Sequence, residues 1–163
     1  MEIIGAQPES KISPIIKNEL GIKNFENINK LGDAFKTESE KRQIELHLLL
    51  VGGMVKPEKR GKKHKDVDLV LYSPQLASEN FPKGDCPKFK TFASFVGDVA
   101  KELGWEIKIE EPWFIDYEYS GDGKVILYPD GEPVEVLPVR QDKLLNSFED
   151  YQKAERDPYI TVF

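Results

Sequence analysis

Two aspartates at the start of an apolar strand are the residues best suited to chemistry in this chain. The segment 66–72 begins with Asp66, Val67 and Asp68 and continues as a hydrophobic run. Because side chains alternate across a strand with period two, both carboxylates project from one face, about 7 Å apart along the strand. Carboxylate oxygens suit Mg²⁺ or Mn²⁺, which bind through a few such groups together with substrate phosphates. The pair therefore predicts a site for a divalent cation that carries a polyphosphate.

A glycine pair and a basic loop precede these aspartates. The apolar strand 46–51 ends at Gly52 and Gly53, where missing side chains let backbone N–H groups approach a phosphate closely. Without further context, a glycine pair after a strand indicates a turn that ends the strand rather than a phosphate-binding site. The loop after it contains six basic residues and one acidic residue, Glu58. Because the chain as a whole has a net charge of −6, this local positive charge indicates that the loop binds one anionic ligand. The basic residues are Lys56, Lys59, Arg60, Lys62, Lys63 and Lys65.

Two segments offer a third carboxylate, and the sequence leaves the choice open. In the strand 133–139, Glu135 lies between Val134 and Val136 and therefore points to the opposite face from both. If the valines pack inward, Glu135 is left in solvent, whereas a sheet covered on that side would place it in a cleft. Asp116 is the alternative, because it also lies between apolar strand neighbours.

The strand 46–51, Gly52–Gly53, the loop and Asp66-x-Asp68 together resemble the signature of the nucleotidyltransferase superfamily. The run from His64 through Lys65 to Asp68 is similar to that of small nucleotidyltransferases that modify lincosamide and aminoglycoside antibiotics. The spacing also looks like the head of tRNA CCA-adding enzymes, but those have large helical domains downstream, and this chain stops at Phe163. The small antibiotic-modifying or toxin–antitoxin type is therefore the better fit.

The resemblance implies a Mg²⁺-dependent (or Mn²⁺-dependent) enzyme that moves a nucleoside monophosphate, AMP by preference, from an NTP to a hydroxyl and releases pyrophosphate. The acceptor is a small molecule, RNA or protein. The strand that carries the third carboxylate has Asp in the family, so Glu is a departure at that position. The implied catalytic and metal-binding residues are Asp66, Asp68 and Glu135, and the implied nucleotide-binding residues are Gly52, Gly53, Lys56, Arg60, His64 and Lys65.

Two other functions are compatible with the same residues. A non-catalytic nucleotide-binding or toxin–antitoxin partner module would keep the fold without a third carboxylate near the aspartates. An RNA-binding protein would use the lysines of the loop on a phosphate backbone and would need no magnesium. The family also implies that a homodimer can form.

The periodicity of apolar residues predicts an α+β protein, with a mixed β-sheet and helices packed on one side. This agrees with the minimal nucleotidyltransferase fold that the resemblance implies. Residues 1–43 form an N-terminal helical segment, and 44–163 form the nucleotidyltransferase domain of one globular unit. The expected helices are about 13–20, 24–42, 89–103 and 142–156, and the expected strands are 46–51, 66–72, 105–109, 113–119, 124–128 and 133–139, with a loop at 73–87.

Composition adds limits of its own. The chain has 163 residues, of which 39% are hydrophobic and 32% charged, as in an ordinary soluble domain. Cys86 is the sole cysteine, which excludes an intrachain disulfide and fits an intracellular compartment. With no apolar run long enough for a bilayer and no signal-peptide pattern at the start, we expect a cytoplasmic protein without a membrane partner. His47, within the first strand, is expected to be structural.

Overall fold

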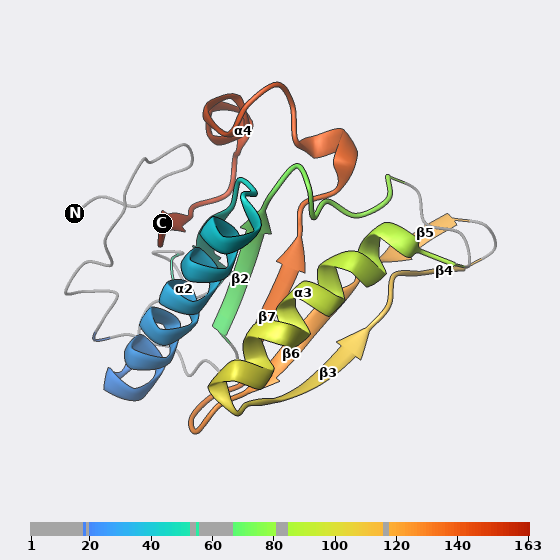
Figure 1. The fold of residues 1–163 in the computed structure, drawn as a ribbon. Coiled ribbons are helices and arrows are strands. Elements are labelled where there is room, and N and C mark those ends of the chain that lie inside the picture. Colours follow the sequence, from blue (N-terminus) through green and yellow to red (C-terminus); the bar gives the residue numbers. More distant parts are fainter. Residues whose placement is uncertain (1–17, 19, 53–54, 56–66, 81–84, 116–117) are drawn as a thin grey trace.

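The structure is a computed structural model that describes residues 18, 20–52, 55, 67–80, 85–115 and 118–163. Helices and strands are both present, and the chain is of the α+β class as expected (Figure 1). The helices are α2 (Ile22–Arg42), α3 (Pro87–Leu103) and α4 (Phe148–Ala154). The strands are β1 (His47–Val51), β2 (Val67–Tyr72), β3 (Glu106–Glu110), β4 (Trp113–Ile115), β5 (Glu118–Gly121), β6 (Lys124–Tyr128), β7 (Val134–Pro138) and β8 (Ile160–Thr161).

Six of these strands form one mixed sheet in the order β3-β6-β7-β2-β1-β8. β2 and β7 run parallel, and the other neighbours in this sheet are antiparallel. The strands expected at 124–128 and 133–139 are β6 and β7, and they pair with each other as an antiparallel hairpin. The parallel pair at the centre of the sheet joins segments more than 60 residues apart in sequence, and it determines which polar residues meet.

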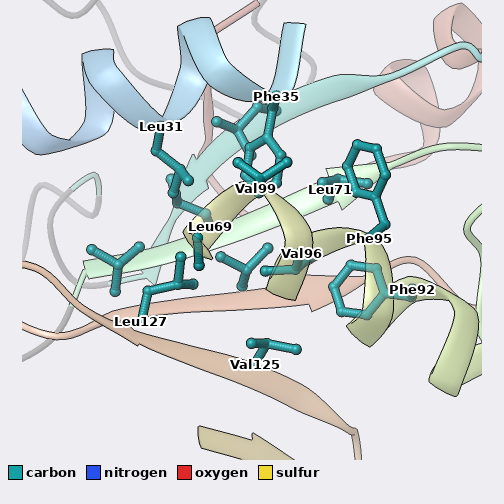
Figure 2. Close-up of a cluster of buried hydrophobic side chains, with 14 of the residues drawn as sticks. Leu31, Phe35, Leu69, Leu71, Phe92, Phe95, Val96, Val99, Val125 and Leu127 are labelled. Carbon is teal, nitrogen blue, oxygen red and sulfur yellow. The ribbon is translucent and has the colours of Figure 1, made fainter. Parts of the chain in front are cut away.

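Helices α2 and α3 cover one face of this sheet (Figure 1). Their apolar faces meet the inward side chains of the strands, such as Leu69 of β2 and Val125 of β6, in one buried cluster (Figure 2). Phe35 of α2 stacks on Phe95 of α3, with the ring centroids 5.8 Å apart. Because one face of every central strand is buried in this way, the alternate side chains must point to the opposite face.

The long helices end where the sequence predicts, but each begins two residues before its predicted start. α3 begins with Pro87 in its first turn, where the missing N–H costs nothing, and ends at Gly104 in a left-handed conformation with φ of 73°. α2 begins two residues before the expected start and ends at Gln43, which is also left-handed. The expected helix at 13–20 lies outside the described residues except at residues 18 and 20.

Two asparagines of α2 hold the β6–β7 turn. The Asn27 side-chain amide donates a hydrogen bond of 2.9 Å to the carbonyl of Asp130, and Asn24 accepts one of 3.1 Å from the Glu132 N–H. Asn27 is buried, so this bond satisfies a polar group that would otherwise be costly to bury. The turn fixes where β7 starts, and therefore where the side chains of β7 lie.

Two expectations for the second half of the chain were wrong, and one strand was missed. The single strand predicted at 113–119 is a separate antiparallel hairpin of β4 and β5. The helix predicted at 142–156 is a 3-10 turn (Gln141–Lys143) followed by the short α4, because Leu145 takes a left-handed conformation with φ of 57° that no helix can continue. β8 was not predicted, since a two-residue strand carries no periodicity.

None of the described helices has the length and apolar character needed to cross a membrane.

Candidate functional site

The face of the sheet away from α2 and α3 carries a pair of carboxylates. Asp68 on β2 is the register partner of Glu135 on the parallel strand β7. Adjacent strands lie about 4.8 Å apart, so the two side chains stand next to each other on one face. The flanking residues Val67, Leu69, Val134 and Val136 are fully buried against the helices. Alternation along the strand had left open on which side of the sheet Glu135 lies. The structure shows that the valines pack against the helices and that Glu135 faces the same side as Asp68.

Glu135 is not left in solvent. Its side chain is 12% exposed and forms an ion pair with the ammonium of Lys124 on β6, the next strand of the sheet. The same ammonium lies 3.8 Å from a carboxylate oxygen of Glu110 on β3. The hydrogen bond to Glu135 is the main reason that the pKa of Lys124 is raised, with further contributions from the charges of Glu110 and Asp68. The ammonium is therefore the counter-ion of an acidic cluster.

Gly52 lies directly against Asp68. Its φ is 82°, which side chains rarely adopt, and a Cβ built on it would lie 2.4 Å from the Asp68 Oδ2 and 3.2 Å from the Asp68 Cβ. The register of β1 and β2 places the neighbouring Val51 opposite Asp68. A glycine is therefore required here both by its backbone conformation and by the close approach of the carboxylate.

The remaining residues of the sequence motif cannot be compared with this geometry. Of the expected catalytic, metal-binding and nucleotide-binding residues, the structure describes Gly52, Asp68 and Glu135 and brings all three together. Within the described ranges, no group of three or more His, Cys, Asp or Glu side chains is arranged to hold a metal ion. The others lie outside the described residues: Gly53, Lys56, Arg60, His64, Lys65, Asp66 and the alternative Asp116.

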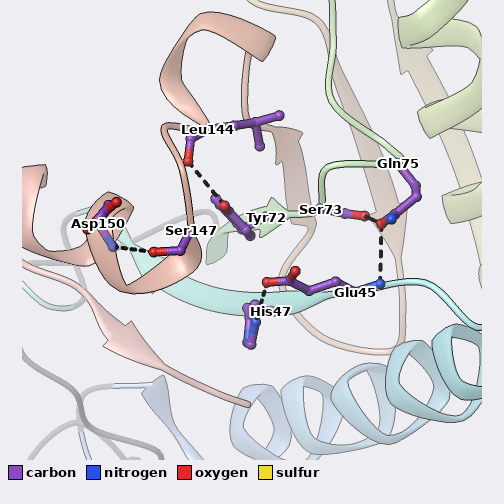
Figure 3. Close-up of polar contacts among 8 residues, drawn as sticks. All are labelled: Glu45, His47, Tyr72, Ser73, Gln75, Leu144, Ser147 and Asp150. Atoms are coloured by element: carbon purple, nitrogen blue, oxygen red, sulfur yellow. Dashed lines mark hydrogen bonds and ion pairs between the residues drawn. The ribbon is translucent and has the colours of Figure 1, made fainter.

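His47 has the structural role that we expected. Its ring stacks on Phe148 of α4, with centroids 3.7 Å apart, and its Nε2 lies 3.2 Å from a carboxylate oxygen of Glu45 (Figure 3). The Tyr72 hydroxyl donates a hydrogen bond of 3.1 Å to the carbonyl of Leu144 in the segment that precedes α4. These contacts fix α4 over the end of β1 and β2 that lies away from Asp68.

A cavity of about 920 Å³ lies on the same face of the sheet. Its lining includes Val70 and Leu137, which follow Asp68 and Glu135 by two residues, together with Tyr151 of α4 and Arg140. Sequence reasoning did not find this cavity. The positions of Val70 and Leu137 follow from the alternation of their strands, but the wall from α4 depends on aromatic contacts between distant segments, which no local pattern reveals.

Comparisons with known proteins add no assignment: no family model matches this chain, and no curated protein matches it.

Proposed function

We propose that this chain is a Mg²⁺-dependent nucleotidyltransferase that transfers a nucleoside monophosphate, with AMP as the first choice, from an NTP to a hydroxyl group and releases pyrophosphate. The observation that supports this proposal is the juxtaposition of Asp68 and Glu135 in register on parallel strands, with Gly52 against the Asp68 carboxylate.

The donor set fits a hard divalent ion. Asp68 and Glu135 offer oxygens from two adjacent strands, and this position already attracts the positive charge of Lys124. Together with Asp66, these carboxylates would hold Mg²⁺ or Mn²⁺, with the phosphates as further ligands. When bound, the ion would draw negative charge from the phosphate oxygens and so favour attack at phosphorus.

Gly52, Glu135 and Lys124 would have separate roles in the reaction. Gly52 carries no side chain of its own, which would let a phosphate oxygen approach its backbone closely. Glu135 would take the proton of the acceptor hydroxyl as its oxygen bonds to the α-phosphorus, while the bond to the bridging oxygen breaks and pyrophosphate leaves with the electron pair. The ion pair with Lys124 holds the Glu135 carboxylate in one place.

One observation favours a second candidate function, a non-catalytic nucleotide-binding module or toxin–antitoxin partner. Lys124 already neutralises Glu135 in this structure, so the carboxylate would be a structural partner of the lysine rather than a base or a ligand. Such a module would bind the nucleotide without releasing pyrophosphate. The two candidates therefore differ in a measurable product.

Binding of a non-hydrolysable ATP analogue, measured by calorimetry with and without Mg²⁺, tests the site. We expect magnesium-dependent binding in the wild type and its loss in Asp68→Asn. Glu106→Gln is the matched control, since it removes a carboxylate from the exposed edge strand β3 of the same sheet. Binding that ignores both magnesium and Asp68→Asn would refute the proposal.

Pyrophosphate release separates the two candidates. With ATP, Mg²⁺ and molar glycerol as a surrogate hydroxyl acceptor, the enzyme should release pyrophosphate. Glu135→Gln should reduce that rate by about 10²–10⁴-fold, the usual contribution of a general base. Magnesium-dependent binding of the analogue without any release by the wild type would instead support the non-catalytic module.

A further inference from the structure

The floor of the cavity of about 920 Å³ includes Val70 and Leu137, which lie on the same two strands as the acidic pair. Val70 and Leu137 are register partners, just as Asp68 and Glu135 are, and each follows its acidic residue by two positions. Two residues of a strand span about 7 Å, and side chains two apart share a face. The floor of the cavity therefore begins one side-chain position beyond the carboxylates.

Gly52 lies on the opposite side of the carboxylates from this cavity. It follows Val51, the partner of Asp68, at the end of the β1–β2 pair where β2 starts. The cavity lies in the other direction, toward the end of β2, where the segment after β7 and α4 provide its walls. A molecule in the cavity and a phosphate at Gly52 would thus approach the acidic pair from opposite sides.

This placement matters for the proposed reaction, in which the attacking and leaving oxygens lie roughly in line across the phosphorus. If the leaving pyrophosphate lies toward Gly52, the attacking hydroxyl must enter from the far side. We infer that the cavity is the acceptor site and that its ligand is a small hydroxyl-bearing molecule with an apolar ring face. The inference rests on the proposed function.

The size and charge of the cavity indicate the class of acceptor. Its volume is that of a pocket for a drug-sized ligand. Val70, Leu137 and the ring of Tyr151 supply an apolar floor and wall. Charged side chains of both signs line it as well, and the acidic ones outnumber the basic ones by four to three. An RNA end needs a basic surface for its phosphates, so this lining disfavours RNA.

The wall also offers a hydrogen-bond acceptor, Glu155, which is held by Tyr151 and by backbone N–H groups. Burial is the main reason that the pKa of Tyr151 is well above its usual value, so its hydroxyl stays protonated at any physiological pH. That hydroxyl lies 3.5 Å from Glu155, whose other carboxylate oxygen accepts hydrogen bonds from the backbone N–H groups of Arg156 and Asp157. Glu155 is thereby held in place as an acceptor for the hydroxyl groups of a ligand.

The test uses phenyl β-D-glucopyranoside, a neutral probe with one aromatic ring and several hydroxyls, and a 12-nucleotide oligoadenylate as the RNA probe. NMR spectra of the ¹⁵N-labelled protein follow the backbone signals of Val70, Leu137 and Tyr151. We expect the glucoside to shift these signals whether or not the ATP analogue and Mg²⁺ are present, and the oligoadenylate to leave them unchanged.

Two variants of α4 make the test specific. Ala154 lines the cavity and is exposed, so Ala154→Trp should fill the space without disturbing the core, and the shifts caused by the glucoside should be lost. Lys153→Trp places the same ring on the adjacent exposed residue, which does not line the cavity, and should leave the shifts intact.

The outcomes separate failure of the acceptor site from failure of the proposed function. If the ATP analogue binds with magnesium but the glucoside causes no shift, or is displaced by the analogue, only the acceptor assignment is wrong. Shifts caused by the oligoadenylate would overturn the small-molecule class. If the analogue does not bind at all, the proposed function fails and the acceptor role fails with it, whatever the glucoside does.

Discussion

Replacing Gly52 by alanine should destabilise the protein for two separable reasons. The first is the backbone, since a φ of 82° lies in a region where a residue with a Cβ loses about 1–2 kcal/mol. The second is the close approach of Asp68, whose Oδ2 would lie 2.4 Å from the new Cβ. Relieving such an overlap in a packed site costs about 1–3 kcal/mol more.

A second glycine provides the control for the backbone term. Gly104, at the end of α3, has a φ of 73°, but a Cβ built there meets nothing within 4 Å. Gly104→Ala should therefore lower the free energy of unfolding by about 1–2 kcal/mol through backbone strain alone. The excess loss in Gly52→Ala over Gly104→Ala then measures the contact with the carboxylate.

A double-mutant cycle assigns that excess to Asp68. In an Asp68→Ala background the oxygen at 2.4 Å is gone, although the Asp68 Cβ at 3.2 Å remains. Most of the excess cost of Gly52→Ala should disappear there, which the cycle reports as a coupling energy between the two positions. Urea unfolding followed by circular dichroism supplies each free energy. An excess that is absent, or that persists unchanged without the carboxylate, would refute the packing of Gly52 against Asp68.

Three further predictions follow from the ionisable groups. Lys124→Met should strengthen the binding of Mn²⁺ about 10-fold or more by removing the ammonium that competes for Glu135, and equal calorimetric affinities for wild type and variant would contradict this. Burial raises the pKa of Tyr151 above its ordinary 10.0, so on raising the pH this hydroxyl ionises in the unfolded chain before it ionises in the folded one. The free energy of unfolding should therefore be unaffected by this group below about pH 10 and should fall above it. Tyr151→Phe should flatten this fall in urea titrations between pH 9 and 11, and an unchanged slope would be the contrary result. Burial also raises the pKa of the Cys86 thiol, so Ellman's reagent should label the native protein far more slowly than the protein in urea.

The regular elements of the fold could be predicted because their signals are local. The apolar positions of α3 recur at helical spacing, and Pro87 and Gly104 mark its ends. The alternation in β7 showed correctly that Glu135 opposes the valines. It did not show which face the helices cover, because that depends on how distant segments pack together. The register between Asp68 and Glu135 is a long-range fact of the same kind.

The elements that sequence reasoning missed are those in which single residues or tertiary contacts override the local pattern. Leu145 adopts a positive φ that its residue type does not favour, and it divides one expected helix into a 3-10 turn and α4. The stack of Phe148 on His47 and the hydrogen bond from Tyr72 to Leu144 hold α4 beside the sheet. The cavity exists because of this placement, so its walls were beyond the reach of any argument from periodicity.

The ion pair of Lys124 gives the site a property that neither strand has alone. Two carboxylates side by side on parallel strands, such as Asp68 and Glu135, repel each other through their charges. The ammonium, whose side chain is 31% exposed, offsets this repulsion without sealing the site from solvent. The ammonium therefore stabilises the close placement of the two carboxylates before any ligand arrives. A divalent ion would displace the lysine, for which Glu110 is an alternative partner with a carboxylate oxygen 3.8 Å from the ammonium.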